Sequence, residues 1–137
     1  MKKGLLLLFA LIYFIITVVL LTLPGSAFPK ERFLDKIFFD KWVHIGLFTI
    51  LVFLWNFWLI KKKNSAPGLT SKFIVVSILA LAYGIAMEFV QKYWVPHRSF
   101  DVTDMVADGV GCLIGLFLSF YIYKKIDPCG NRGRNQN

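Results

Sequence analysis

Acidic residues and cysteines are scarce in this 137-residue chain, which carries eight Asp and Glu and two Cys against sixteen Lys and Arg. Cys112 falls inside a long apolar run and Cys129 in the polar C-terminal stretch. Their separation disfavours a disulfide between them, so both are interpreted as packing residues. Internal repeats are absent, and the basic residues do not form the folded basic surface that nucleic-acid binding requires. Nucleic acid is therefore not expected as a partner.

Long apolar runs dominate the sequence. Hydrophobic residues make up 57% of the chain and aromatic residues 17%, with a mean hydropathy of +0.62, which is too apolar for an ordinary soluble domain. Four runs are long enough to cross a hydrocarbon core, which takes about 20 residues: 4–23, 42–60, 73–90 and 105–123. We therefore predict an all-α integral membrane protein with four transmembrane helices. Residues 1–125 are expected to form one domain, and residues 126–137 a polar cytoplasmic tail.

The first apolar run has features of both a signal peptide and a membrane anchor. It follows Lys2 and Lys3, and the small residues of segment 24–27 could serve a signal peptidase. The apolar core of a signal peptide has about 7 to 15 residues, and this run is longer. We therefore expect a retained anchor.

The orientation follows from the distribution of Lys and Arg, because cytoplasmic loops carry the excess. With four crossings, one side has ten basic residues and one acid, and the other has six basic residues and seven acids. This predicts that both termini are cytoplasmic. The basic inner rim, at 61–63 and 132–134, favours anionic lipid head groups, so membrane lipids are expected partners.

The segment between the first two crossings allows two interpretations. Pro29 can start a helix, and Leu34, Ile37 and Phe38 then fall at spacings of three and four with charges between them. This pattern indicates a short amphipathic helix on the outer membrane face. An irregular loop whose aromatic residues enter the interface fits the sequence equally well.

Local signals mark the outer ends and the contacts of the last two helices. Pro96 disfavours helical geometry at Val95, so the third helix should end before it. Asp104 is suited to be the N-cap or a first-turn acid of the fourth helix. Gly111 and Gly115 form a G-x-x-x-G pair, which permits close approach of a neighbouring helix.

Three ionisable residues fall within the apolar runs. His44, Glu88 and Asp108 are the only Asp, Glu, His, Lys or Arg there, each in a different run and two or three residues from its outer end. A shared polar pocket open to the outer face explains their common depth, and ionisable residues inside a membrane indicate function by default. Asp40 shares a helical face with His44 at i, i+4, where its carboxylate can fix the tautomer of the imidazole.

The cluster has several competing interpretations. A structural clasp, in which Arg98 or Lys41 neutralises Glu88 and Asp108, would serve only to fix the packing. General acid and base chemistry by Glu88 and His44, with Arg98 gripping a phosphate or carboxylate, is chemically coherent.

Other chemistry receives less support from the sequence. His44, Glu88, Asp104 and Asp108 offer metal donors, but they lack a recognised ligand spacing such as H-E-x-x-H, so neither a metal nor another cofactor is predicted. A nucleophilic Ser99 has no paired base in the sequence, and Cys112 lies a turn deeper on a Gly-rich face.

Three spaced blocks between about residues 40 and 121 resemble the VanZ-like membrane proteins. They are Asp40-Lys41-x-x-His44, Tyr83-Gly84-x-x-x-Glu88-x-x-Gln91, and Arg98 with Asp104-x-x-x-Asp108-x-x-Gly111-x-x-x-Gly115. Members of that family commonly have Asn at the position of Asp108. The resemblance implies a small helical protein of the bacterial cytoplasmic membrane and envelope, whose founding member is linked to resistance to the glycopeptide teicoplanin. It implies no particular reaction.

These observations predict an outward-facing polar pocket that binds or modifies an envelope component, such as a lipid-linked or cell-wall molecule. Lys41 and Arg98 are the expected anion contacts, and His44 and Glu88 are the candidate catalytic residues. Further binding residues are expected to be Asp40, Gln91, Asp101, Asp104 and Asp108. An enzyme acting on a lipid-linked substrate and a non-catalytic packing scaffold remain the alternatives.

Overall fold

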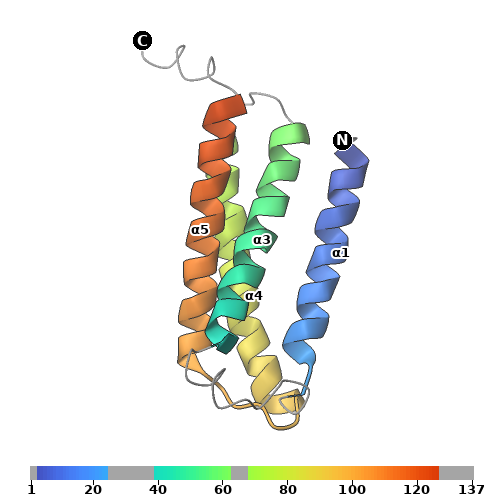
Figure 1. The fold of residues 1–137 in the computed structure, drawn as a ribbon, viewed down its shortest axis with the longest axis vertical. Coiled ribbons are helices and arrows are strands. Elements are labelled where there is room, and N and C mark those ends of the chain that lie inside the picture. Colours follow the sequence, from blue (N-terminus) through green and yellow to red (C-terminus); the bar gives the residue numbers. More distant parts are fainter. Residues whose placement is uncertain (1–2, 25–38, 63–67, 127–137) are drawn as a thin grey trace.

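Four helices make up the regular structure of the part of the chain that the computed structural model describes, which is residues 3–24, 39–62 and 68–126. They are α1 (Lys3–Thr22), α3 (Phe39–Lys62), α4 (Leu69–Trp94) and α5 (Val102–Ile126). Each is long and apolar enough to cross a membrane. Helices α3, α4 and α5 form the centre of the bundle, and α1 lies against α3 and α4 (Figure 1). The predicted all-α membrane class with four spans is therefore confirmed.

Each helix except α1 extends beyond the apolar run that predicted it. Helix α3 begins at Phe39 and α4 continues to Trp94. The end of α4 has the predicted cause: Val95, before Pro96, is extended at φ −105° and ψ 117°, and its N–H still donates to Gln91 O at 3.3 Å. Polar and interfacial residues thus add helical turns at the membrane surface, where hydropathy does not detect them.

Some predictions concern parts of the chain outside the described residues. The short interfacial helix falls mostly within 25–38, and Cys129 and the basic tail fall within 127–137. Helix α1 begins and α5 ends at the same end of the bundle (Figure 1). This agrees with an even number of crossings, while the side of the membrane on which that end lies stays a prediction.

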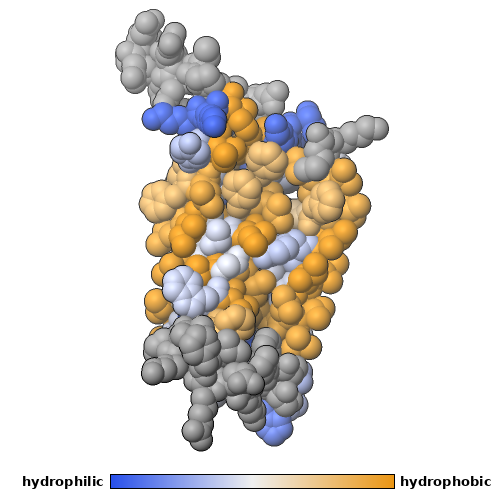
Figure 2. Space-filling view, viewed as in Figure 1, coloured by the Kyte–Doolittle hydropathy of each residue, from blue (hydrophilic) through white to orange (hydrophobic). Residues whose placement is uncertain are grey.

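The surface of the bundle suits a lipid environment. Large apolar side chains such as Ile15, Ile78 and Phe117 are more than 60% exposed. Figure 2 shows hydrophobic residues over most of the middle of the visible face, with hydrophilic residues gathered toward its ends. An apolar surface of this extent is expected where lipid, not water, is the solvent.

The most extensive helix contact in the bundle joins α3 and α5, and the G-x-x-x-G pair lies in it. A Cβ atom added to Gly111 would lie 2.6 Å from Ile45 O, and one added to Gly115 would lie 2.7 Å from Thr49 O. Thr49 Oγ1 also donates to Gly111 O at 3.1 Å. The predicted role of the two glycines in packing is therefore confirmed, and it fixes how the polar residues of α3 and α5 face each other.

Helix α1 is joined to the bundle by hydrogen bonds as well as by apolar packing. Tyr13 Oη donates to Leu47 O of α3 at 3.2 Å, and Gln91 Nε2 of α4 donates to Leu21 O at 2.9 Å. The hydroxyls of Thr17 and Tyr83 lie 3.1 Å apart. Because hydrogen bonds in lipid cannot be replaced by water, these contacts tie α1 to α3 and α4.

Candidate functional site

The three ionisable residues of the apolar runs meet at one end of the bundle. His44 is 2% exposed, and Glu88 and Asp108 are each 1% exposed. His44 lies five residues after the start of α3, and Glu88 and Asp108 lie six residues from the nearby ends of α4 and α5. At 1.5 Å per residue this is roughly 7.5 to 9 Å of helix, deeper than the apolar runs indicated. The greater depth follows from the additional helical turns.

His44 and Asp108 form the central pair of this cluster. His44 Nδ1 lies 2.8 Å from Asp108 Oδ1, across the interface between α3 and α5. Gly84 of α4 leaves room for this carboxylate, because a Cβ there would lie 2.5 Å from Asp108 Oδ2. The hydrogen bond that orients the imidazole thus comes from Asp108 on another helix, and not from Asp40 as the i, i+4 spacing suggested. Asp40 lies in the first turn of α3, and its side chain is 46% exposed.

Lys41 connects α3 to the start of α5. Its Nζ donates to Asp101 Oδ2 at 2.7 Å and also to Asp104 Oδ1. The side chain of Asp104 is 5% exposed, whereas that of Asp101 is 40% exposed. Lys41 is therefore engaged by two carboxylates of the α5 end, and not by Glu88 and Asp108 as the clasp interpretation had it.

Asp101 caps helix α5. Its Oδ1 accepts from Thr103 N at 2.8 Å and from Thr103 Oγ1 at 2.6 Å, in the manner of an N-cap residue. The Lys41 ammonium first, and then the Thr103 hydroxyl, hold the pKa of Asp101 well below its usual value, at about 2. Asp104 is a first-turn acid of the helix, which was one of its two predicted roles.

Glu88 and Gln91 lie one turn apart on α4 and face different partners. Glu88 Oε2 accepts from the backbone N–H of Asp101 at 3.0 Å, so it anchors the connection between α4 and α5. The same carboxylate interacts electrostatically with His44, Asp104 and Asp108. Gln91 Nε2 donates to the α1 backbone. Its expected contact with a ligand stays a prediction, while its contact with α1 is structural.

Arg98 follows the turn that ends α4. Its Nη1 lies 3.8 Å from Asp40 Oδ2, and its side chain is 11% exposed. Together with Lys41 it places two cations at the rim of a cluster of carboxylates. The cluster therefore contains more acids than basic residues. We call it the outer-end cluster, a name that follows the predicted orientation. Its members are Asp40, Lys41, His44, Glu88, Arg98, Asp101, Asp104 and Asp108.

One subset of the outer-end cluster has the composition of a metal site. Single donor atoms of Asp40, His44 and Asp104 all lie within 4.8 Å of one another. His44 Nε2 lies 4.0 Å from Asp104 Oδ2. No metal was predicted from the sequence, and the possible donors considered there were His44, Asp104, Glu88 and Asp108. Residue spacing alone does not show that Asp108 lies on the other ring nitrogen.

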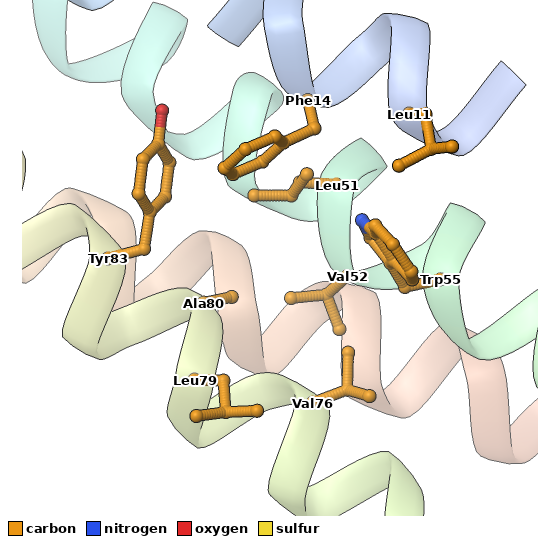
Figure 3. A pocket seen from close by; sticks show the side chains of 9 residues that line it. All are labelled: Leu11, Phe14, Leu51, Val52, Trp55, Val76, Leu79, Ala80 and Tyr83. Carbon is orange, nitrogen blue, oxygen red and sulfur yellow. The ribbon is translucent and has the colours of Figure 1, made fainter. Parts of the chain in front are cut away.

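An apolar cavity of about 360 Å³ lies between α1, α3 and α4, and it was not predicted from the sequence (Figure 3). It is lined by Leu11, Phe14, Leu51, Val52, Trp55, Val76, Leu79, Ala80 and Tyr83. Tyr83 lies at the boundary of the cavity and precedes Gly84, which touches the outer-end cluster. Hydropathy could not reveal this cavity, because all faces of these helices are apolar.

Comparison with known proteins identifies the family. A VanZ/LLP1 family model matches residues 5–123. The chain belongs to the VanZ/LLP1 family. The match begins within α1, so the family unit includes this helix as well as the three that carry the outer-end cluster. The resemblance recognised over residues 40–121 is therefore confirmed and extended.

A curated relative covers part of the same region. An uncharacterized protein of Schizosaccharomyces pombe (strain 972 / ATCC 24843) is 30% identical over 88 residues, which is 63% of this chain and 49% of that protein. This VanZ/LLP1 chain thus spans about half the length of the curated relative it matches. No solved structure matches the chain.

Proposed function

We propose that this protein binds the polar head of an amphipathic membrane or envelope component at the outer-end cluster. The observation that carries the proposal is the burial of His44, Glu88 and Asp108 at one depth, contributed by three different helices. Burying ionisable groups in a membrane protein is costly, and such groups commonly mark ligand or ion sites. A lipid-linked or cell-wall molecule satisfies this description.

The chemistry of the cluster indicates which head group it would accept. Lys41 and Arg98 were expected to contact an anion, but Lys41 donates to two carboxylates and Arg98 lies 3.8 Å from a third. Ionised carboxylates only accept hydrogen bonds. A head group rich in hydroxyl or ammonium donors, such as a lipid-linked sugar, therefore fits the cluster better than a bare anion.

The apolar cavity provides a place for the hydrocarbon part of the same ligand. Its lining comes from helices at hydrocarbon depth, and Leu79, one of the lining residues, is 63% exposed toward the lipid. Tyr83 belongs to the lining and lies one helical turn and one residue from Glu88. Figure 3 shows its ring at the edge of the lining residues, beside the ring of Phe14, and the two ring centroids lie 5.1 Å apart. A chain in the cavity would thus place its head near the cluster.

The charge distribution supports an outward-facing site. Lys61, Lys62, Lys124 and Lys125 lie in the last turns of α3 and α5, at the opposite end from the cluster. Under the positive-inside rule that end is cytoplasmic, and the outer-end cluster then faces the exterior. A reporter that works only in the cytoplasm should be active when it is fused at Asn137. Activity at Asn137 of a reporter that works only outside the cytoplasm would overturn this orientation.

The pair of His44 and Asp108 supports a second candidate function, acid and base catalysis on the bound ligand. A buried carboxylate that orients an imidazole is a recurring arrangement for proton transfer. The sequence suggested Glu88 as the partner of His44, whereas the structure provides Asp108. Glu88→Gln preserves shape and removes basicity, so it tests whether Glu88 takes part in proton transfer.

Two measurements test the proposed function. Lipid that copurifies with the full-length protein, identified by mass spectrometry, should be a hydroxyl- or amine-bearing species and should decrease in His44→Gln and Glu88→Gln at equal protein level. Equal lipid content in wild type and both variants would contradict the proposal. If wild type converts that lipid chemically and His44→Gln does not, the protein is an enzyme that acts on it.

The susceptibility phenotype needs its own test, because the fungal relative gives no support to a role confined to glycopeptide resistance. A deletion strain complemented with wild type should regain its teicoplanin susceptibility pattern. Glu88→Gln and Arg98→Ala should restore it less well. If deletion leaves susceptibility unchanged, this phenotype does not belong to this protein.

A further inference from the structure

We infer that Asp40, His44 and Asp104 form a divalent-cation site, in which Asp108 orients the imidazole without touching the cation. The inference rests on the geometry of the outer-end cluster and holds whether or not a lipid binds there. The three donor residues come from the beginnings of α3 and α5, which the close glycine contact holds together.

The imidazole of His44 is oriented by its hydrogen bond to Asp108. Asp108 Oδ1 lies 2.8 Å from Nδ1, and an ionised carboxylate can only accept, so Nδ1 donates. In the neutral ring the lone pair then resides on Nε2. Metal-binding histidines are typically held in this way by a carboxylate on the nitrogen that does not bind the metal.

The other ring nitrogen of His44, Nε2, lies near Asp104. The His44 side chain is 3% exposed, and none of the hydrogen bonds among the described residues uses its Nε2 atom. The nearest charged oxygen is Asp104 Oδ2, at 4.0 Å, which is too far for a hydrogen bond. In the neutral ring the Nε2 lone pair and this carboxylate oxygen repel each other, and a cation between the two atoms, or a proton on Nε2, removes the repulsion.

The donor spacing suits a small cation after a modest adjustment. The three donor atoms lie within 4.8 Å of one another. Nitrogen and oxygen ligands bind Zn²⁺ at about 2.1 Å, which places tetrahedral ligands roughly 3.4 Å apart. Asp40 can make most of the change, because its side chain is 46% exposed in the first turn of α3.

Lys41 does not block this site. It binds Oδ1 of Asp104, which leaves Oδ2 facing His44, and it is shared with Asp101. Among the described residues of the cluster, carboxylates also outnumber Lys and Arg by five to two, and a dication would reduce this surplus. The carboxylates are Asp40, Glu88, Asp101, Asp104 and Asp108, and the basic residues are Lys41 and Arg98.

The donor set indicates the kind of cation. One imidazole and two carboxylates suit Zn²⁺ or Mn²⁺, whereas Ca²⁺ prefers six to eight oxygens. Three protein ligands leave one position open in a tetrahedral site. An oxygen of a lipid head group could take that position; this last step alone rests on the proposed function.

Direct metal binding tests the inference. Full-length protein in detergent, stripped with a chelator and dialysed, should bind one equivalent of Zn²⁺ by calorimetry. The affinity should fall at least tenfold in Asp40→Asn and in His44→Gln, and roughly 10- to 100-fold in Asp108→Asn through loss of orientation. Co²⁺ in place of Zn²⁺ should give a visible absorption band that Asp40→Asn weakens.

Lys92→Gln is the control, because Lys92 is exposed in the last turn of α4, at the same end of the bundle, and does not belong to the outer-end cluster. It should bind Zn²⁺ as wild type does, and elution volume and melting temperature should show that each variant is folded. Absence of saturable binding in wild type, or equal affinity in wild type and Asp40→Asn, would overturn the site. If the protein binds Zn²⁺ but the chelator does not change the amount of copurified lipid, the metal site is upheld and is independent of the proposed function.

Discussion

His44 on α3 and Asp108 on α5 share a hydrogen bond of 2.8 Å at a depth where neither side chain is more than 3% exposed. The pair exists because Gly111 and Gly115 bring the two helix backbones together and Gly84 leaves space for the carboxylate. The glycines and the ionisable residues of this VanZ/LLP1 chain therefore act as one unit, in which packing determines the geometry of the polar groups.

Replacing Asp108 by Ala should destabilise the protein more than replacing it by Asn. Asp108→Ala leaves His44 Nδ1 without a partner in a buried site, which costs about 1 to 3 kcal/mol. Asp108→Asn keeps a carbonyl oxygen that can accept from Nδ1, so the loss should be smaller. Unfolding midpoints in detergent measure both changes. Equal destabilisation by Ala and Asn would show that the hydrogen bond is not what stabilises the pair.

The G-x-x-x-G contact predicts a position-specific effect of adding one methyl group. Gly111→Ala and Gly115→Ala place a Cβ within 2.7 Å of an α3 carbonyl oxygen, so α3 and α5 must separate. Overpacking of this kind costs about 1 to 3 kcal/mol. Thermal unfolding in detergent should show the loss.

Gly109 on the same helix is the matched control for that experiment. A Cβ there would have its nearest contact, Leu81 Cδ1, at 3.8 Å, which is an ordinary distance. Gly109→Ala should be neutral or stabilising, because Ala favours a helix over Gly by about 1 kcal/mol. If all three Gly→Ala variants behave alike, close approach of α3 and α5 is not the reason for these glycines.

The apolar runs were sufficient to predict the class and the number of the helices. They could not place the helix ends, because residues such as Asp40, Lys41 and Lys92 continue the helices at the interface despite their polarity. The convergence of His44, Glu88 and Asp108 followed from their common position in three runs. Their partners did not follow, because a hydrogen bond between helices depends on helix rotation, which close packing determines and residue spacing does not.

The low pKa of Asp101 predicts that the protein loses stability in acid. Its pKa is about 2 in the folded protein, below the ordinary value of 3.8, because Lys41 and Thr103 stabilise the charged form. The stabilisation is therefore complete above about pH 4 and is lost as the pH falls toward 2. Its size should be small, since the side chain is 40% exposed.

The measurement for Asp101 is the melting temperature between pH 5 and pH 2 in the presence of a chelator. Asp101→Asn cannot titrate at this position, so its curve should be flatter than that of wild type over the lower part of the range. Parallel curves for the two proteins would mean that the Lys41 contact does not stabilise the charged form of Asp101.

Gln91 should hold α1 against α4, because its amide donates to the backbone of α1. Its amide donates to Leu21 O, and Gln91→Leu removes that bond at a loss of about 1 kcal/mol while keeping a similar volume. Disulfide crosslinking between cysteines introduced in α1 and α4 should become less efficient. The exposed neighbour Lys92 is the control: Lys92→Gln should leave crosslinking unchanged, and an equal loss in both variants would contradict a specific role for Gln91.

Filling the apolar cavity should separate lipid binding from the polar site. Ala80 is 8% exposed and lines the cavity, and Ala80→Leu adds a side chain that occupies part of its volume of about 360 Å³. Copurified lipid should therefore decrease, while Zn²⁺ affinity should stay unchanged, because the outer-end cluster is not altered. Val75→Leu is the control, since Val75 is 54% exposed toward the lipid and does not line the cavity. If Ala80→Leu retains the lipid content of Val75→Leu, the hydrocarbon chain of the ligand does not occupy this cavity.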